Sequence, residues 1–190
     1  MTDGVDLYWI PLGAGAGGAF VRWSGRCYEA VVAAVGRRRR QPLFHSALDV
    51  RVDGVSTAIE MTPVWITRGE RGVVGEGAVG LRALGRWRVF RYEVRRWTGG
   101  SIPDASEAVG GAVCLSDDAA VAGRVLELVA RVPLATWGRD ELGTGDMWNS
   151  NSVVSWLLTS AGMPLDGVQP PGDGRAPGWE AGIVAAHAAG

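Results

Sequence analysis

The stretch 44-FHSALDVRVDGVSTAIEM-61 decides the fold that this chain is expected to adopt. Two runs, Phe44–Val52 and Val55–Met61, alternate apolar and polar residues and flank Asp53-Gly54. That dipeptide suits a two-residue primed turn, because both of its central positions require positive φ. The sequence therefore predicts an antiparallel hairpin in which Val52 pairs with Val55.

This register divides the hairpin into an apolar face and a polar face. On the polar face, His45 and Glu60 become diagonal neighbours about 7 Å apart at the backbone, and Asp49 shares their side. A carboxylate beside an imidazole fixes its tautomer and raises its basicity, although an incidental pair on a solvent-exposed face is an equal alternative. The apolar face, expected to be core, carries Leu48, Val50, Val52, Val55, Ile59 and Met61.

A second informative stretch, 146-DMWNSNSVVSWLL-158, places small polar side chains at the start of an apolar helix. Ser150 heads the face that packs inward, while Asn149 or Asn151 suits the N-cap. Free backbone N–H groups and the positive end of the helix dipole would lie beside the Ser150 hydroxyl. This is where a nucleophile would sit, although Ser150 or Asn149 acting only as a cap is the alternative. The inward face continues through Val153, Val154, Leu157, Leu158 and Ala161.

The order of the remaining elements favours an α+β fold over a wound parallel sheet. We expect one domain, with an N-terminal strand and helix region (1–42), a core (43–162) and a Pro/Gly-rich tail with a short helix (163–190). The other expected elements are a strand at Leu7–Leu12, an extended piece at Ala19–Trp23, a helix from Ser24 to Gly36, an irregular connection over Arg68–Gly80, a strand at Trp87–Trp97, a helix from Ser116 to Pro133 and a terminal helix containing His187.

Composition narrows the possible functions. The 190 residues are 47% hydrophobic, enough for one core, and all 19 basic residues are Arg, which fits the codon bias of a high-GC bacterial genome. A net charge of −1 gives no overall attraction to nucleic acid or to an anionic membrane. The N-terminus lacks a signal-peptide pattern and no stretch is long enough to span a membrane, so we expect a cytoplasmic protein.

Two cysteines and two histidines form no disulfide framework and no metal-ligand spacing, so neither a metal nor a cofactor is expected. Cys114, between Val113 and Leu115, is predicted to be a buried small hydrophobe. His187 is expected to be solvated. The run Arg37–Arg40 is expected to be a solvated end of the preceding helix, with a phosphate or acidic-partner patch as the minor alternative.

His45 on one strand, Glu60 on the next and Asn149-Ser150-Asn151-Ser152-Val153-Val154 opening a later helix resemble the circularly permuted branch of the NlpC-type papain-like superfamily. That branch includes YiiX-type hydrolases and lecithin-retinol acyltransferase relatives, and the resemblance covers about residues 43 to 160. It implies a papain-like α+β fold with an antiparallel sheet packed against helices. The chain departs from the family pattern in one respect, because Ser150 stands where the family has its nucleophilic cysteine.

The resemblance implies a hydrolase or acyltransferase that acts on an amide or ester carbonyl. Ser150 would be the nucleophile, His45 the general base and Glu60 or Asp49 the group that orients it. The Ser150 N–H and a side-chain amide, that of Asn149 or Asn151, would form an oxyanion hole. The alternative is an inactive module that binds a ligand in the same cleft.

The expected partner is a small-molecule, peptide or acyl substrate, with no nucleic acid, and the oligomeric state is left open. Substrate-pocket candidates are Trp137, Trp148 and Trp179, dense around the Ser150 segment. Cys27 is a weaker alternative nucleophile, because the chain from it to His45 is too short to hold the intervening strands of the unpermuted family. A third, lower-ranked possibility is a nucleotide enzyme built on Gly13-x-Gly15-x-x-Gly18, which we discount because the residues after Gly18 look extended rather than helical.

Overall fold

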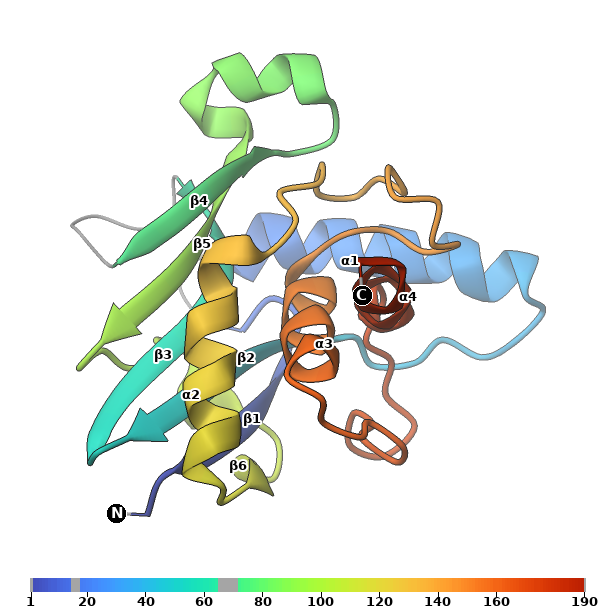
Figure 1. Ribbon diagram of the computed structural model, residues 1–190. Coiled ribbons are helices and arrows are strands. Elements are labelled where there is room, and N and C mark those ends of the chain that lie inside the picture. Colours follow the sequence, from blue (N-terminus) through green and yellow to red (C-terminus); the bar gives the residue numbers. More distant parts are fainter. Residues whose placement is uncertain (1, 15–17, 65–71, 190) are drawn as a thin grey trace.

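The protein is described here by a computed structural model that covers residues 2–14, 18–64 and 72–189. A six-stranded antiparallel sheet, in the order β4-β5-β3-β2-β1-β6, forms its centre (Figure 1). The fold is therefore α+β, as predicted. The strands are β1 (Gly4–Pro11), β2 (Phe44–Val52), β3 (Val55–Pro63), β4 (Val73–Ala78), β5 (Arg91–Thr98) and β6 (Ala112–Ser116). The helices are α1 (Gly18–Val35), α2 (Ala119–Leu128), α3 (Ser150–Ser160) and α4 (Trp179–Ala189), with 3₁₀ turns η2 (Arg82–Arg86), η3 (Arg88–Phe90), η4 (Ala105–Glu107) and η5 (Val129–Arg131).

The predicted hairpin is confirmed as β2 and β3, at the middle of the sheet. Val52 lies opposite Val55 and Asp49 opposite Ala58, in the predicted register. Asp53 and Gly54 have φ values of 52° and 74°, the positive pair that a primed two-residue turn requires. Because side chains alternate along a strand, this register decides which residues of both strands face the helices.

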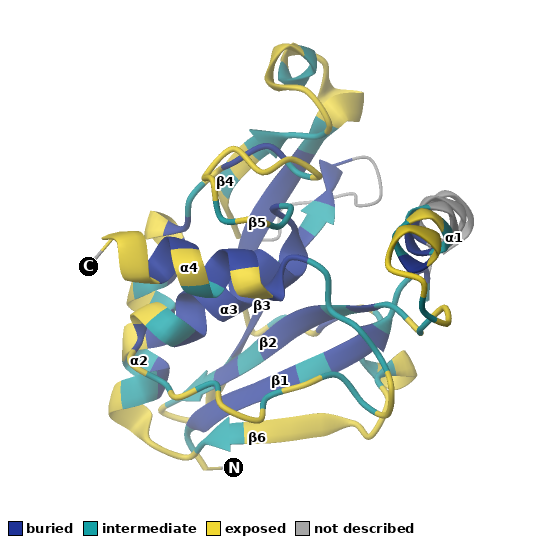
Figure 2. Ribbon diagram, turned by 90° about the vertical axis from the view of Figure 1, so that its right-hand side faces the viewer, coloured by how far each residue is buried: buried dark blue, intermediate teal, exposed yellow. Residues whose placement is uncertain are grey.

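One face of the sheet is covered by α2 and α3, and α4 packs on the outer side of α3 (Figures 1 and 2). Leu48, Val50 and Ile59 from the hairpin meet Val153 and Leu157 of α3 in the main core. This core also takes side chains from β1 and α4, so these two elements share one core with residues from 43–162. Val55, expected in the core, is instead exposed because it directly follows the turn.

The opposite face of the sheet is less polar than predicted. Ala47 and Ala58 are buried there with Ile10 and Ile102 in a second, smaller cluster. Small side chains at two adjacent positions let the segment that contains Ile102 lie close to the strands.

Three predicted elements differ from the structure in whole or in part. Ala19–Trp23 was expected to be extended but belongs to α1, because the strand preference of aromatic and β-branched residues is weak and helix context overrides it. Trp87–Phe90 was expected to start a strand, but Arg88–Phe90 forms a 3₁₀ turn and β5 begins only at Arg91. Within the irregular connection predicted over residues 68–80, Val73–Ala78 is a strand because it pairs with β5.

The glycines of β4 favoured the prediction of an irregular connection, but in the structure glycine allows close packing at this strand. A Cβ atom on Gly77 would lie 2.3 Å from the Tyr92 ring, so the aromatic side chain occupies the space that glycine leaves. Cys114 also departs from expectation, since it lies exposed on the edge strand β6 rather than buried.

Candidate catalytic pocket

A pocket of about 360 Å³ opens where the first turn of α3 meets the start of β2. It collects residues from the two ends and the middle of the chain, and apolar side chains dominate its wall. The lining residues that the following paragraphs use are Tyr28, His45, Trp137, Asn149, Ser150 and Asn151.

The sequence left the N-cap of α3 open between Asn149 and Asn151, and the structure decides for Asn149. Asn149 is the N-cap, and its Oδ1 accepts a hydrogen bond of 2.8 Å from the N–H of Asn151. Ser152 completes a capping box by accepting the Asn149 N–H at 3.0 Å. The Asn149 amide donates one of its two N–H groups to the carbonyl oxygen of Pro177 at 2.8 Å.

Ser150 is the first residue of α3 and lines the pocket with only 6% of its surface exposed. Among the described residues, its hydroxyl has no hydrogen-bond partner. The first N–H groups of a helix have no partner within the helix, and the dipole makes this end positive. A negative charge that develops on a carbonyl oxygen beside Ser150 would be stabilised there.

His45 is the second residue of β2 and lines the same pocket, although it lies more than a hundred residues before Ser150 in the sequence. Burial lowers the pKa of His45 to about 4. The imidazole is therefore neutral at pH 7, the form that accepts a proton. No hydrogen bond joins it to Ser150 in the described part of the chain.

Asn151 connects the two elements that carry these groups. Its Oδ1 accepts from the Ser46 hydroxyl at 2.9 Å, and its amide donates to the carbonyl oxygens of Phe44 (3.0 Å) and Pro177 (2.9 Å). This buried side chain thus ties the start of β2 to α3, and it has a positioning role rather than a free donor for an oxyanion.

The predicted carboxylates do not reach the pocket. Glu60 accepts a hydrogen bond of 2.9 Å from Arg95, a fully buried arginine on β5 that also pairs with Glu93. Asp49 accepts from the Ser56 hydroxyl and pairs with Arg51 at 3.3 Å. Neither Glu60 nor Asp49 lines the pocket. The predicted register was correct, but arginines on the same sheet face engage these carboxylates.

Of the three tryptophans proposed for the pocket, Trp137 alone lines it, with its ring edge-to-face against Tyr92 at 6.0 Å. Trp148 is buried in the main core. Trp179 packs against Trp9 with ring centroids 5.0 Å apart and lines a different pocket, next to α4. Density of tryptophan along the sequence did not indicate which ring faces the cavity.

Tyr28, which the sequence analysis did not single out, lines the pocket from α1. Burial, followed by the nearby negative charge of Asp146, raises the pKa of Tyr28. Asp146 itself accepts the N–H groups of Met147 (2.7 Å) and Gly178 (2.6 Å) and so holds the loop before α4 against the start of α3. Asp146 is the first residue of the stretch 146–158, but no sequence pattern predicted its hydrogen bond with Gly178. Cys27 also lies in α1, and its side chain is outside the described part of the structure.

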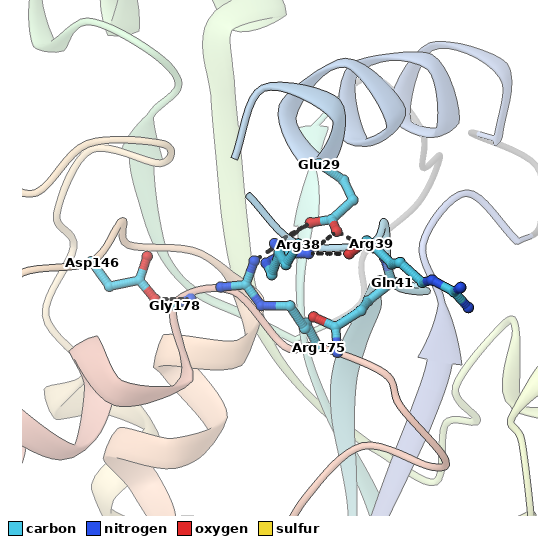
Figure 3. A network of polar contacts seen from close by, with 7 residues as sticks. All are labelled: Glu29, Arg38, Arg39, Gln41, Asp146, Arg175 and Gly178. Atoms are coloured by element: carbon cyan, nitrogen blue, oxygen red, sulfur yellow. Dashed lines mark hydrogen bonds and ion pairs between the residues drawn. The ribbon is translucent and has the colours of Figure 1, made fainter. Parts of the chain in front are cut away.

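A polar network beside the pocket holds α1 to the rest of the molecule (Figure 3). Glu29 is buried and accepts from Arg38 at 2.5 and 3.0 Å, from the N–H of Gln41 at 2.8 Å and from Arg175 at 3.4 Å. The bond from Arg38 is the largest cause of the shift that lowers the pKa of Glu29 to about 2. Part of the Arg37–Arg40 run is thus structural, since Arg38 is a partner of Glu29 and not simply solvated.

The Gly13-x-Gly15-x-x-Gly18 pattern extends outside the described residues at 15–17. Gly18 does begin α1, so the argument against a dinucleotide site from an extended segment was wrong. In the described ranges, His, Cys, Asp and Glu side chains form no cluster that would hold a metal ion. None of the helices described is both long and apolar enough to cross a membrane.

Comparisons with protein-family models, with curated proteins and with solved structures each return no match to this chain. Assignment of a function therefore depends on the pocket itself.

Proposed function

We propose that this protein is a serine-dependent hydrolase or acyltransferase of permuted NlpC-type, papain-like architecture. The observation that carries the proposal is that Ser150, at the N-terminus of α3, and His45, on β2, line one pocket. A hydroxyl needs a base to remove its proton as it attacks, and a helix N-terminus suits the oxyanion that results. The pocket combines these two requirements.

In the proposed reaction the Ser150 Oγ attacks the carbonyl carbon of an ester or amide, and its proton passes to a ring nitrogen of His45. The negative charge on the carbonyl oxygen is stabilised by the N–H of Ser150. As the intermediate collapses, His45 returns the proton to the departing alcohol or amine, which leaves an acyl-enzyme. Water or an acceptor amine then attacks the acyl carbon, again with His45 as base, and Ser150 is regenerated.

The wall of the pocket indicates the substrate class. Leu12, Leu43, Val79 and Met147 line it together with Trp137. Apolar lining with a few polar groups at one end is typical of sites that take an apolar group and orient it by its polar head. We propose an apolar acyl group as the part of the substrate that enters.

The positions of Glu60 and Asp49 favour a second candidate function, an inactive module that binds a ligand in the same pocket. Glu60 and Asp49 are engaged by Arg95 and Arg51, so neither supplies the carboxylate of a triad in this conformation. The enzyme proposal therefore rests on a Ser150–His45 dyad, whereas the binding module requires only the cavity.

An activity-based probe separates the two candidates. The full chain is incubated with an alkyl fluorophosphonate, and its intact mass is measured for wild type, Ser150→Ala, His45→Gln and Ser160→Ala. Ser160 is an exposed serine at the other end of α3 and serves as the matched control. A dyad predicts one adduct per chain in wild type and Ser160→Ala, none in Ser150→Ala and labelling at least about a hundredfold slower in His45→Gln.

Thermal melts first establish that each variant is folded. An adduct that persists in Ser150→Ala would overturn the assignment of the nucleophile. Absence of any adduct in wild type, with an apolar ligand raising Tm equally in wild type and Ser150→Ala, would instead establish the binding module.

A further inference from the structure

The connection between β4 and β5 presents large apolar side chains to solvent. We call residues 81–90 the 81–90 segment; it projects beyond the end of the sheet at the top of Figure 1. Trp87 is 45% exposed and Val89 54%, and Leu81 and Phe90 are exposed as well. Scattered apolar residues are normal on a surface, but four within ten residues, two of them aromatic, mark an interaction site.

Hydrogen bonds hold the backbone of the 81–90 segment in an ordered series of turns. Successive turns are closed by bonds from Leu84 N–H to Leu81 O (3.0 Å), Trp87 N–H to Leu84 O (3.0 Å) and Phe90 N–H to Trp87 O (2.9 Å). Arg91 donates to the carbonyl oxygen of Gly85 at 2.5 Å. The backbone is therefore held in a conformation that keeps these side chains pointing outward.

The aromatic and basic groups of the segment are combined in one cluster. Trp87 and Phe90 meet edge-to-face at 6.4 Å, and the Arg86 guanidinium lies 3.9 Å from the centre of the Trp87 ring. Ordering these side chains in advance lowers the entropy lost when a partner binds.

The charge of the segment is entirely positive. Four arginines lie between Glu76 and Glu93, with no acidic residue between those two positions. Arg82 pairs with Glu141 and Arg91 with Glu76, whereas Arg86 and Arg88 form no ion pair with any other described residue. A local charge of this kind attracts an anionic surface even though the whole chain has a net charge of −1.

We propose that the 81–90 segment docks the protein on the surface of an anionic phospholipid membrane. Tryptophan and phenylalanine settle at the headgroup level, and arginine pairs with lipid phosphate. Leu81 and Val89 favour this partner over nucleic acid, because aliphatic side chains gain from the acyl boundary but offer no ring to stack on bases. The inference is independent of the proposed chemistry, since it uses no residue that acts on a substrate.

The test is co-sedimentation of the full chain with vesicles of phosphatidylcholine alone or mixed with phosphatidylserine. We expect the protein to sediment with the mixed vesicles only, and both Trp87→Ser and the double variant Arg86→Gln/Arg88→Gln to lower the partition coefficient about tenfold or more. The matched control is Arg39→Gln/Arg40→Gln, which removes the same charge from exposed arginines in another part of the chain. It is expected to bind as wild type does.

Several results would overturn the proposal. Equal loss in the Arg39/Arg40 control would show that total charge, not this segment, governs binding. No sedimentation with either vesicle would exclude a lipid surface. A dimer, or a complex with a single-stranded oligonucleotide, that forms without vesicle binding and is lost in Trp87→Ser would assign the segment to that partner instead. Thermal melts matching wild type establish that all three variants are folded, which their exposed positions predict.

Discussion

At the scale of single residues, His45 and Glu60 show how one face of a hairpin gives two different environments. The register places both on one face of the hairpin, yet His45 lines the pocket at the N-terminus of α3 and Glu60 pairs with a buried arginine. Glu60 pairs with Arg95 and not with the imidazole, and burial is the cause that lowers the pKa of His45. A neutral base is then available over the whole neutral range, without a charged partner.

The shift in His45 predicts how stability depends on pH. The folded pKa of about 4 lies below the ordinary value of 6.5, so between these values the unfolded chain binds a proton that the folded protein does not. Stability is therefore unaffected above pH 6.5 and falls as the pH drops from 6.5 toward 4. We expect His45 to account for about 2 kcal/mol of the decrease in unfolding free energy between pH 7 and pH 5.

Urea unfolding at pH 7 and pH 5 measures this contribution. His45→Gln should reduce the pH-dependent loss by that amount, whereas His187→Gln, at an exposed position of α4, should leave it in place. An unchanged loss in His45→Gln would show that the imidazole is solvated in the native protein.

At the scale of elements, α3 and α4 pack so closely that only glycine fits between them. A Cβ atom on Gly182 of α4 would lie 2.1 Å from both the Ser152 carbonyl oxygen and the Ser155 Oγ. Ser152 and Ser155 donate in turn to the carbonyl oxygens of Gly178 (2.7 Å) and Trp179 (2.7 Å). The second Ser of the Asn-Ser-Asn-Ser run thus serves packing between helices, while the first lines the pocket.

Two helical glycines give a matched pair of variants. Gly182→Ala should lower the unfolding free energy by about 2 kcal/mol or more, because the backbone of α3 leaves no room for the added methyl group. Gly123→Ala, in α2, meets nothing within 4 Å and should raise the unfolding free energy by about 0.5–1 kcal/mol through helix propensity. Urea titration of both variants is the measurement, and a neutral Gly182→Ala would contradict the close packing of α3 and α4.

At the scale of the whole molecule, the pocket depends on contacts between segments that are distant in the sequence. Glu29, in the first helix, reaches Arg175 near the end of the chain, and Pro177 accepts from both asparagines at the start of α3. The chain before β2 and the chain before α4 lie side by side, joined by a backbone hydrogen bond between Phe44 and Arg175, and both line the same cavity.

The Glu29 network should stabilise the protein in a pH-dependent way. The pKa of Glu29 in the folded protein, about 2, lies below its ordinary value of 4.5. The contribution of this carboxylate to stability is therefore present above pH 4.5 and is lost as the pH falls through 2. Since Arg38 is partly exposed, we expect Glu29→Gln to cost about 2 kcal/mol at pH 7, less than the full shift implies. Unfolding free energies of wild type and Glu29→Gln, measured at pH 7 and pH 3.5, test this, because the difference between the two proteins should be smaller at pH 3.5. The control Glu127→Gln, at an exposed site on α2, should change the unfolding free energy little at either pH.

The sequence by itself determined the features that depend on near neighbours in the chain. The turn at Asp53-Gly54 predicted the hairpin and its register, and the polar residues around Ser150 predicted the start of α3. The apolar spacing after Ser150 predicted side chains that α3 buries, although the polar side chains from Asn151 to Ser155 are buried as well. These hold because turn geometry, capping and periodicity act within a few residues.

Only the tertiary structure decided which side chains meet. The β-branched and aromatic residues after Gly18 suggested a strand but belong to α1, and the glycines of β4 suggested a loop although Gly77 packs against Tyr92 and Gly75 against Leu134. Arg95, on β5, binds Glu60, the carboxylate that the sequence predicted as a partner for His45. A buried charge binds the strongest partner within reach, and which groups lie within reach depends on how distant segments pack, which no local pattern encodes.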